Sequence, residues 1–254
     1  MKLLLINPNT SEAFTAAALK AARACAAPGT QVDAVCSPCG PQTLEGYFDE
    51  VISAIGVLKV VQREKEDYDG FISACFSNHF SIAAARQLTN KPIVGIFEPP
   101  MLLAKQLGNQ FSIVTSSPRW KPILEKDLRA VGLESSCASV RPIGLDVEAL
   151  EQLSTEALEE HLCLQAERAL HEDGAEVIVL GCCGLAGLSD RLQARLGVPV
   201  LDPVASAVTI LEDLVSYGFR TSRIMSFSPV MPQAYKNVPE IFCSLYEGRD
   251  ISQC

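Results

Sequence analysis

Two cysteines of this chain each follow a short apolar run that predicts a buried strand. Cys75 follows "GFISA" (70–74), and Cys182 follows "EVIVLG" (176–181). A thiolate can remove a proton from a carbon atom next to a carbonyl group, and a thiol on the opposite face can return one. Unpaired backbone N–H groups at the start of a helix would lower the pKa of such a thiol and bind the enolate oxygen as it forms. The two cysteines therefore predict a racemase or epimerase that needs no cofactor.

Small or polar residues follow both cysteines, which lets a ligand approach the backbone closely. We expect the backbone N–H groups of residues 76–78 and 183–184 to hold the developing enolate. The candidate substrate-binding residues of these two loops are Phe76, Ser77, Asn78, Cys183 and Gly184. No Lys, Arg or Asp occurs within the loops, so we expect a neutral small molecule as the substrate rather than a free amino acid.

Short apolar runs alternate with helical patterns along the whole chain. The strand-like runs cover residues 2–6, 32–35, 70–74, 92–96, 111–115, 135–140, 176–180 and 199–202. Continuous apolar strands separated by helices are typical of parallel sheets that helices bury on both faces. We therefore predict an α/β fold.

The two halves of the chain repeat the same spacing. Cys75 lies 17 residues before Pro92, and Cys182 lies 17 residues before Pro199, each proline opening the next strand. The residue after the first strand of each half also precedes the cysteine by a nearly equal interval, 68 residues in one half and 67 in the other. This repetition predicts two pseudo-symmetric parallel-sheet domains, with the active site in the cleft between them because loops after parallel strands share one edge.

The repeat also sets the expected domain boundaries. We expect the first α/β domain to comprise residues 1–100 plus 206–254, the last helix and tail returning to it, and the second to comprise residues 101–205.

The composition limits the kinds of partner. The 254 residues are 48% hydrophobic and 20% charged, with a formal net charge of −9. This charge argues against a nucleic acid or an anionic membrane as a partner. No uncharged apolar stretch reaches about 18 residues, and the run after Met1 is too short for a signal peptide. We therefore expect a cytoplasmic protein with reduced thiols that acts on a small molecule.

No sequence motif indicates a metal or a nucleotide. Cys36 and Cys39 form a C-x-x-C without a second pair, and the adjacent thiols of Cys182 and Cys183 have no histidine nearby in sequence. The glycines around them match neither the dinucleotide-binding fingerprint nor the phosphate-binding loop. We expect no metal site and no cofactor.

An ordered set of motifs resembles the hydantoin racemases of the cofactor-independent aspartate/glutamate racemase superfamily. The motifs are "INPNTS" (6–11), "GPQTLEGYFDE" (40–50), "ACFS" (74–77), "IVTSS" (113–117), "VLGCCGL" (179–185), "VPVLDPVASAV" (198–208) and "GFRTS" (218–222). The resemblance implies two pseudo-symmetric domains, a homo-oligomer, and catalytic cysteines at Cys75 and Cys182. It also implies substrate contacts from Asn9, Thr115 and Ser116, and a backbone role for Cys183. The implied substrate is a 5-substituted hydantoin or a relative such as allantoin.

The chain departs from the bacterial pattern after the first cysteine. Bacterial hydantoin racemases tend to have "CFGDPG" where this chain has "CFSNHF" (75–80), a variant that resembles fungal members of the group. His79 could favour the Cys75 thiolate as a cation, or simply pack or face solvent. The departure also keeps two alternatives open. One is a decarboxylase or cis–trans isomerase of the superfamily that uses a single cysteine, and the other is a binding protein without catalytic activity.

Overall fold

Two four-stranded parallel sheets form the framework of the computed structural model, which describes residues 1–231 and 239–242. The strands of the first sheet are β1 (Lys2–Asn7), β2 (Gln31–Cys36), β3 (Gly70–Ser73) and β4 (Ile93–Gly95). Those of the second are β5 (Phe111–Thr115), β6 (Cys137–Pro142), β7 (Val177–Leu180) and β8 (Val200–Leu201). The order is β2-β1-β3-β4 in one sheet and β6-β5-β7-β8 in the other. The predicted α/β fold with a repeated sheet is confirmed.

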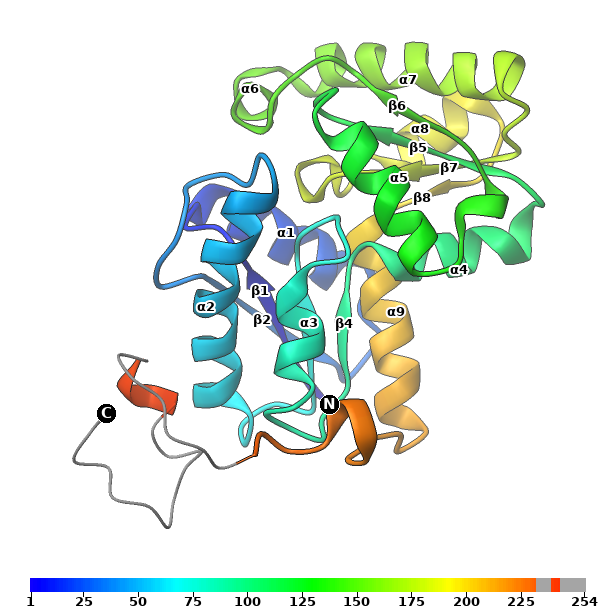
Figure 1. Cartoon of the computed structure of the whole chain (residues 1–254). Helices are drawn as coiled ribbons and strands as arrows, with labels where there is room; N and C mark the ends of the chain where they lie inside the picture. The colour runs from blue at the N-terminus through cyan, green and yellow to red at the C-terminus, as the bar shows by residue number, and fades with distance from the viewer. Residues whose placement is uncertain (232–238, 243–254) are drawn as a thin grey trace.

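Helices cover the sheets, which lie in two lobes (Figure 1). The α-helices are α1 (Glu12–Cys25), α2 (Tyr47–Glu64), α3 (Phe80–Ala85), α4 (Glu98–Leu107), α5 (Trp120–Ala130), α6 (Val147–Gln152), α7 (Thr155–Glu172), α8 (Ser189–Leu196) and α9 (Pro203–Ser216). Short 3₁₀ turns are η1 (Glu134–Ser136), η2 (Cys183–Leu185) and η3 (Met225–Phe227). None of the helices in the described part of the chain is long and apolar enough to cross a membrane.

The apolar runs of the sequence form the centre of each sheet. Leu3, Leu5 and Ile6 of β1 are at most 1% exposed, and all four residues of β7 are buried. One continuous core contains side chains of both sheets, including Ile72 of β3 and Ile113 of β5. The hydrophobic effect therefore joins the two lobes as well as stabilising each of them.

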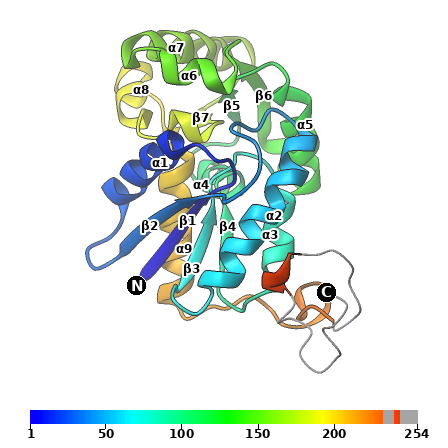
Figure 2. The ribbon, with the colours of Figure 1, turned by 90° about the vertical axis from the view of Figure 1, so that its left-hand side faces the viewer.

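The last described helix returns to the first sheet. α9 packs against α1, α4 and β3, and α4 in turn contacts strands of both sheets. Figure 2 shows α9 beside the first sheet. Residues 232–238 and 243–254, which the expected first domain includes, lie outside the described residues.

The strand pairing brings the predicted loops together. β1 pairs with β3 so that Ile6 lies opposite Ser73, and β5 pairs with β7 so that Val114 lies opposite Leu180. The carboxyl ends of parallel strands meet at one edge. The loop after β1 therefore lies beside the loop that carries Cys75, and the loop after β5 lies beside the one that carries Cys182.

Candidate active site

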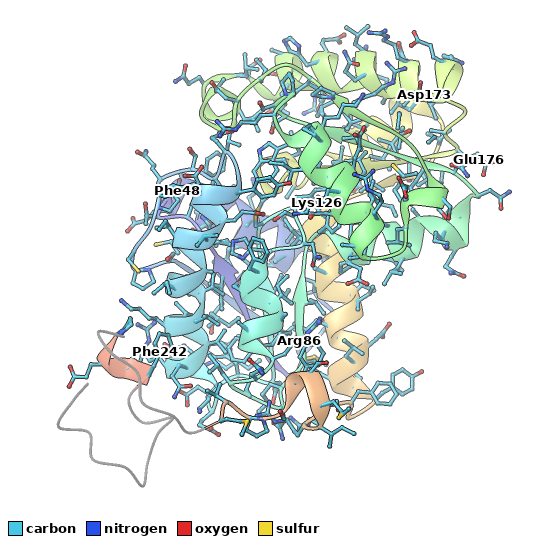
Figure 3. The ribbon with its side chains drawn as sticks, in the orientation of Figure 1. Phe48, Arg86, Lys126, Asp173, Glu176 and Phe242 are labelled. Atoms are coloured by element: carbon cyan, nitrogen blue, oxygen red, sulfur yellow. The ribbon has the colours of Figure 1, made fainter. Side chains whose placement is uncertain are left out.

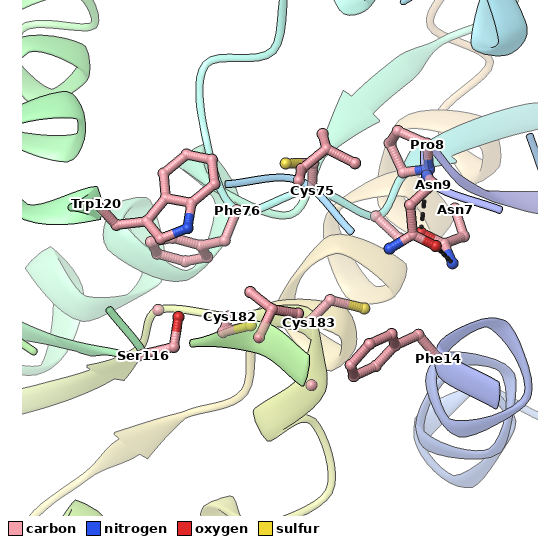
Figure 4. A pocket seen from close by; sticks show the side chains of 15 residues that line it. Asn7, Pro8, Asn9, Phe14, Cys75, Phe76, Ser116, Trp120, Cys182 and Cys183 are labelled. Carbon is pink, nitrogen blue, oxygen red and sulfur yellow. Dashed lines mark hydrogen bonds between the residues drawn. The ribbon is translucent and has the colours of Figure 1, made fainter. Parts of the chain in front are cut away.

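The two cysteines line a single pocket of about 500 Å³ between the two sheet edges. Cys75 comes from the loop after β3, and Cys182 from the loop after β7. Figure 4 shows them on opposite sides of the pocket, with Trp120 and Phe76 at one end and Asn9 toward the other. A small molecule in this pocket would have one thiol on each face.

Most of the predicted site residues line this pocket. Seven of them do so: Asn9, Cys75, Phe76, Ser116, Cys182, Cys183 and Gly184. The other three are not among its lining residues: Ser77, Asn78 and Thr115. The walls also contain residues that the sequence analysis did not single out, among them Phe14, Leu44, Trp120 and Val147. For Trp120 a signal existed, because it begins the helix directly after the second polar loop.

The loop after β1 holds Asn9 in a fixed orientation. Asn7 Nδ2 donates to Asn9 Oδ1 at 2.6 Å and to Thr15 Oγ1 at 2.9 Å. The backbone N–H of Ser11 also donates to Asn9 Oδ1, at 2.9 Å. Ser11 Oγ in turn accepts from Phe14 N–H as the N-cap of α1. These bonds use the oxygen of the Asn9 amide, so its Nδ2 group is the part that can donate to a ligand.

Thr115 positions the loop that carries Cys182. Its Oγ1 donates to the backbone oxygen of Gly181 at 2.8 Å, and the residue is 1% exposed. A side chain at position 181 would not fit, because an added Cβ would lie 2.6 Å from Ile113 and 2.9 Å from Thr115. Glycine therefore allows β5 and the Cys182 loop to lie this close together.

Ser77 and Asn78 bind other parts of the protein in the structure. Ser77 is fully buried, and its hydroxyl donates a short hydrogen bond to Glu50 Oε1 on α2. Asn78 is exposed, and its backbone N–H donates to Asp127 Oδ2 on α5 at 2.9 Å. Two buried carboxyl groups therefore lie behind the Cys75 loop.

Burial raises the pKa of both thiols, so the expectation of lowered pKa values is wrong. Desolvation raises the pKa of Cys182 to about 11, against the opposing effects of the Gly184 backbone N–H and Ser116. Desolvation also raises the pKa of Cys75. The helix that was expected to stabilise the Cys75 thiolate begins only at Phe80, and Cys182 precedes a three-residue 3₁₀ turn. A thiolate formed in this pocket is consequently a strong base.

His79 is neutral in the structure. Its Nδ1 accepts from the Ser81 backbone N–H at 3.2 Å and caps α3, so the ring hydrogen is on Nε2, which lies 3.0 Å from Ser53 Oγ. The side chain is 1% exposed, and burial lowers its pKa to about 4. Of the two roles left open for His79, the structure supports packing and excludes a cation beside Cys75.

Within the described residues, no group of three or more His, Cys, Asp or Glu side chains could hold a metal ion. None of the residues that line the pocket is a Lys, Arg, His, Asp or Glu. What the arrangement offers chemically is therefore the thiols, the amide of Asn9, the hydroxyl of Ser116 and backbone N–H groups.

Comparisons with known proteins agree with this chemistry. The family model for Asp/Glu/hydantoin racemases matches residues 3–211. Hydantoin racemase from Pseudomonas sp. (strain NS671) is 37% identical over 243 residues, which cover 95% of this chain and 97% of that protein. An uncharacterised protein of Schizosaccharomyces pombe is 30% identical over 227 residues, covering 88% of this chain and 95% of that protein.

Solved structures also match over nearly the whole chain. Allantoin racemase from Klebsiella pneumoniae superposes with a TM-score of 0.90 at 40% identity, covering 97% of this chain and 99% of that one. Arylmalonate decarboxylase, with a TM-score of 0.59 at 21% identity over 84% of this chain and 92% of that one, shares the fold.

Proposed function

This chain belongs to the Asp/Glu/hydantoin racemase family, and we propose that it racemises 5-substituted hydantoins, allantoin included, with Cys75 and Cys182 as its acid–base pair. The observation that carries the proposal is the pair of thiols lining one pocket from the corresponding loops of two repeated sheets. Two proton-transferring groups on opposite faces are what inversion at a single carbon requires.

The proposed reaction moves one proton off the ring carbon and one onto it. The thiolate of one cysteine takes the proton from the carbon next to the carbonyl, and the electron pair of the C–H bond moves onto the carbonyl oxygen as an enolate. Backbone N–H groups of Phe76, Cys183 and Gly184 stabilise this oxygen. The thiol of the other cysteine then gives its proton to the opposite face and becomes the thiolate.

The pocket favours a neutral and partly apolar substrate. The ring amides of a hydantoin match the Nδ2 group of Asn9 and the hydroxyl of Ser116, which has no hydrogen-bond partner among the described residues. The walls formed by Leu44, Trp120 and Val147 suit an apolar group on the ring. A free amino acid would bring two charges into a site that lines no charged side chain.

The test uses proton NMR in deuterium oxide with single enantiomers of several 5-substituted hydantoins and of allantoin. We expect the signal of the ring-carbon proton to disappear faster than without enzyme, with optical rotation falling to zero. If no member of the panel exchanges, the hydantoin assignment fails. Release of carbon dioxide from malonates would instead identify a decarboxylase.

Three further expectations are part of the proposal. A homo-oligomer is supported by exposed apolar side chains on α2, such as Phe48 at 77% (Figure 3), which suit burial against a second copy. Sedimentation of the purified chain tests it. A cytoplasmic location fits chemistry that needs reduced thiols. The packing of α9 against α1 and β3 supports a first domain of residues 1–100 plus 206–254 and a second of 101–205.

A further inference from the structure

A buried chain of hydrogen bonds leads from Cys75 away from the substrate pocket. Cys75 Sγ lies 3.4 Å from Ser77 Oγ, and Ser77 Oγ bonds Glu50 Oε1. Ser77 is 0% exposed and Glu50 is 3% exposed. A carboxyl group is thus joined to the candidate catalytic thiol by one hydroxyl, on the side opposite to the substrate.

The surroundings of Glu50 do not fix it as a carboxylate. No Lys or Arg forms an ion pair with it within the described residues. Lys126 lies over the ring of Tyr47, 4.6 Å from its centroid, and only partly offsets the effect of the buried Asp127 carboxylate. Burial is the main cause that raises the pKa of Glu50, as it does for Asp127.

The position of Glu50 is fixed by a second set of contacts. Ser53, one helical turn further along α2, donates through Oγ to the Glu50 backbone oxygen at 3.0 Å. The same hydroxyl lies 3.0 Å from Nε2 of the neutral His79. The residues that distinguish this chain after its first cysteine, Ser77 and His79, therefore both connect the cysteine loop to α2.

We propose that Glu50 is a positioning residue that sets the protonation state of Cys75 through Ser77; the proposal rests on the acid–base role of Cys75 proposed above. When Glu50 is protonated, it donates to Ser77 Oγ, and the Ser77 hydroxyl donates to the Cys75 thiolate. When Glu50 is ionised, it accepts from Ser77, and Ser77 Oγ accepts from the Cys75 thiol. The two states differ by two coupled transfers: the Ser77 proton moves to sulfur while the Glu50 proton moves to the Ser77 oxygen.

The other thiol has a different environment. Cys182 interacts with the Gly184 backbone N–H and with Ser116, and its carboxylate neighbour Glu45 donates nothing to it but instead accepts from the Val147 backbone N–H at 3.1 Å. Cys75 is also close enough to Cys182, Cys183 and Asp127 for their charges to matter. Only Cys75 has an internal proton acceptor behind it among the described residues, so the two halves of the reaction are chemically unequal.

The test measures how fast iodoacetamide alkylates each thiol at about pH 8, with mass spectrometry assigning the product to Cys75, Cys182 or Cys183. The alkylation rate reports the thiolate fraction. The variants are Glu50→Gln, which replaces the carboxyl by an amide donor, and Ser77→Ala, which removes the bridging hydroxyl. Asp127→Asn is the matched control, because Asp127 is a buried carboxyl behind the same loop that does not bond Ser77.

We expect opposite effects of the two variants on Cys75. Glu50→Gln should raise its alkylation rate about tenfold, since removing a like charge shifts a thiol by about one pKa unit or more. Ser77→Ala should lower the rate severalfold, since the thiolate loses its donor. Asp127→Asn should have a smaller effect than Glu50→Gln, and the rate at Cys182 should stay within about twofold of wild type in all three.

Three results would overturn the proposal: no increase in Glu50→Gln, changes of the same sign in both variants, or an increase in Asp127→Asn as large as in Glu50→Gln. If Glu50→Gln does not fold, Ser77→Ala decides alone, and an unchanged or higher rate at Cys75 refutes the coupling. The assay contains no substrate. A chain that shows the opposite shifts but exchanges no hydantoin would keep this inference and lose the proposed function.

Discussion

Acid should weaken the fold through His79, and His79→Asn isolates the effect. The unfolded chain binds a proton at His79 with a pKa near 6.5, whereas in the fold burial lowers the pKa to about 4. A lowered pKa stabilises the fold fully above 6.5, and this contribution is lost as the pH falls toward 4. From these two values, the free energy of unfolding falls by about 2 kcal/mol at pH 5 and about 3 kcal/mol at pH 4.

The Asn variant keeps the cap and removes the titration. Asn can accept from the Ser81 backbone N–H as His79 Nδ1 does, and Asn is among the preferred N-cap residues. It loses the contact with Ser53 Oγ, which lowers stability by about 1–3 kcal/mol at every pH. Urea unfolding at pH 8, 6, 5 and 4 measures both proteins. We expect wild type to be the more stable at pH 8 and its advantage to disappear by about pH 4.

The comparison of variants cancels the other acid-sensitive groups. Buried carboxyls such as Glu50 and Asp202 have raised pKa values, so their effect on stability has the opposite sign, but it is the same in both proteins. His171→Gln, at an exposed position of α7, is the control and should follow the wild-type curve at each pH. A difference between wild type and His79→Asn that stays constant from pH 8 to pH 4 would refute the neutral, buried state of His79.

Two other substitutions test the packing around the site. Thr115→Val should lower the free energy of unfolding by about 1–3 kcal/mol, because the Gly181 oxygen loses a buried donor, and an unchanged urea midpoint would contradict this. Gly56→Ala lies within α2, where alanine normally stabilises a helix. Here the added Cβ would overlap Ser37 Oγ and lie 2.9 Å from Cys39 O, so we expect a loss of about 1–3 kcal/mol, and a rise in melting temperature would show that the clash is absent.

The sequence predicted the repeated sheets and the position of the two cysteines, because apolar runs and equal intervals depend on backbone periodicity alone. It could not predict where a polar side chain in a loop points. Ser77 bonds a carboxyl 27 residues earlier in the chain, and Thr115 bonds an oxygen 66 residues later. The same limit applies to the pKa values of Cys75 and Cys182, since the desolvation that raises them arises from segments of both sheets that meet only in the folded chain.

The most direct test of the two-thiol account is hydrogen exchange by the single-cysteine variants Cys75→Ala and Cys182→Ala in deuterium oxide. Each variant is incubated separately with the two enantiomers of a hydantoin that the wild type racemises. The account predicts that neither variant racemises, and that each exchanges the ring-carbon proton of only one enantiomer, the two variants choosing opposite enantiomers. If either variant still racemises, or if both exchange the same enantiomer, the two cysteines do not act on opposite faces of the substrate and the account is wrong.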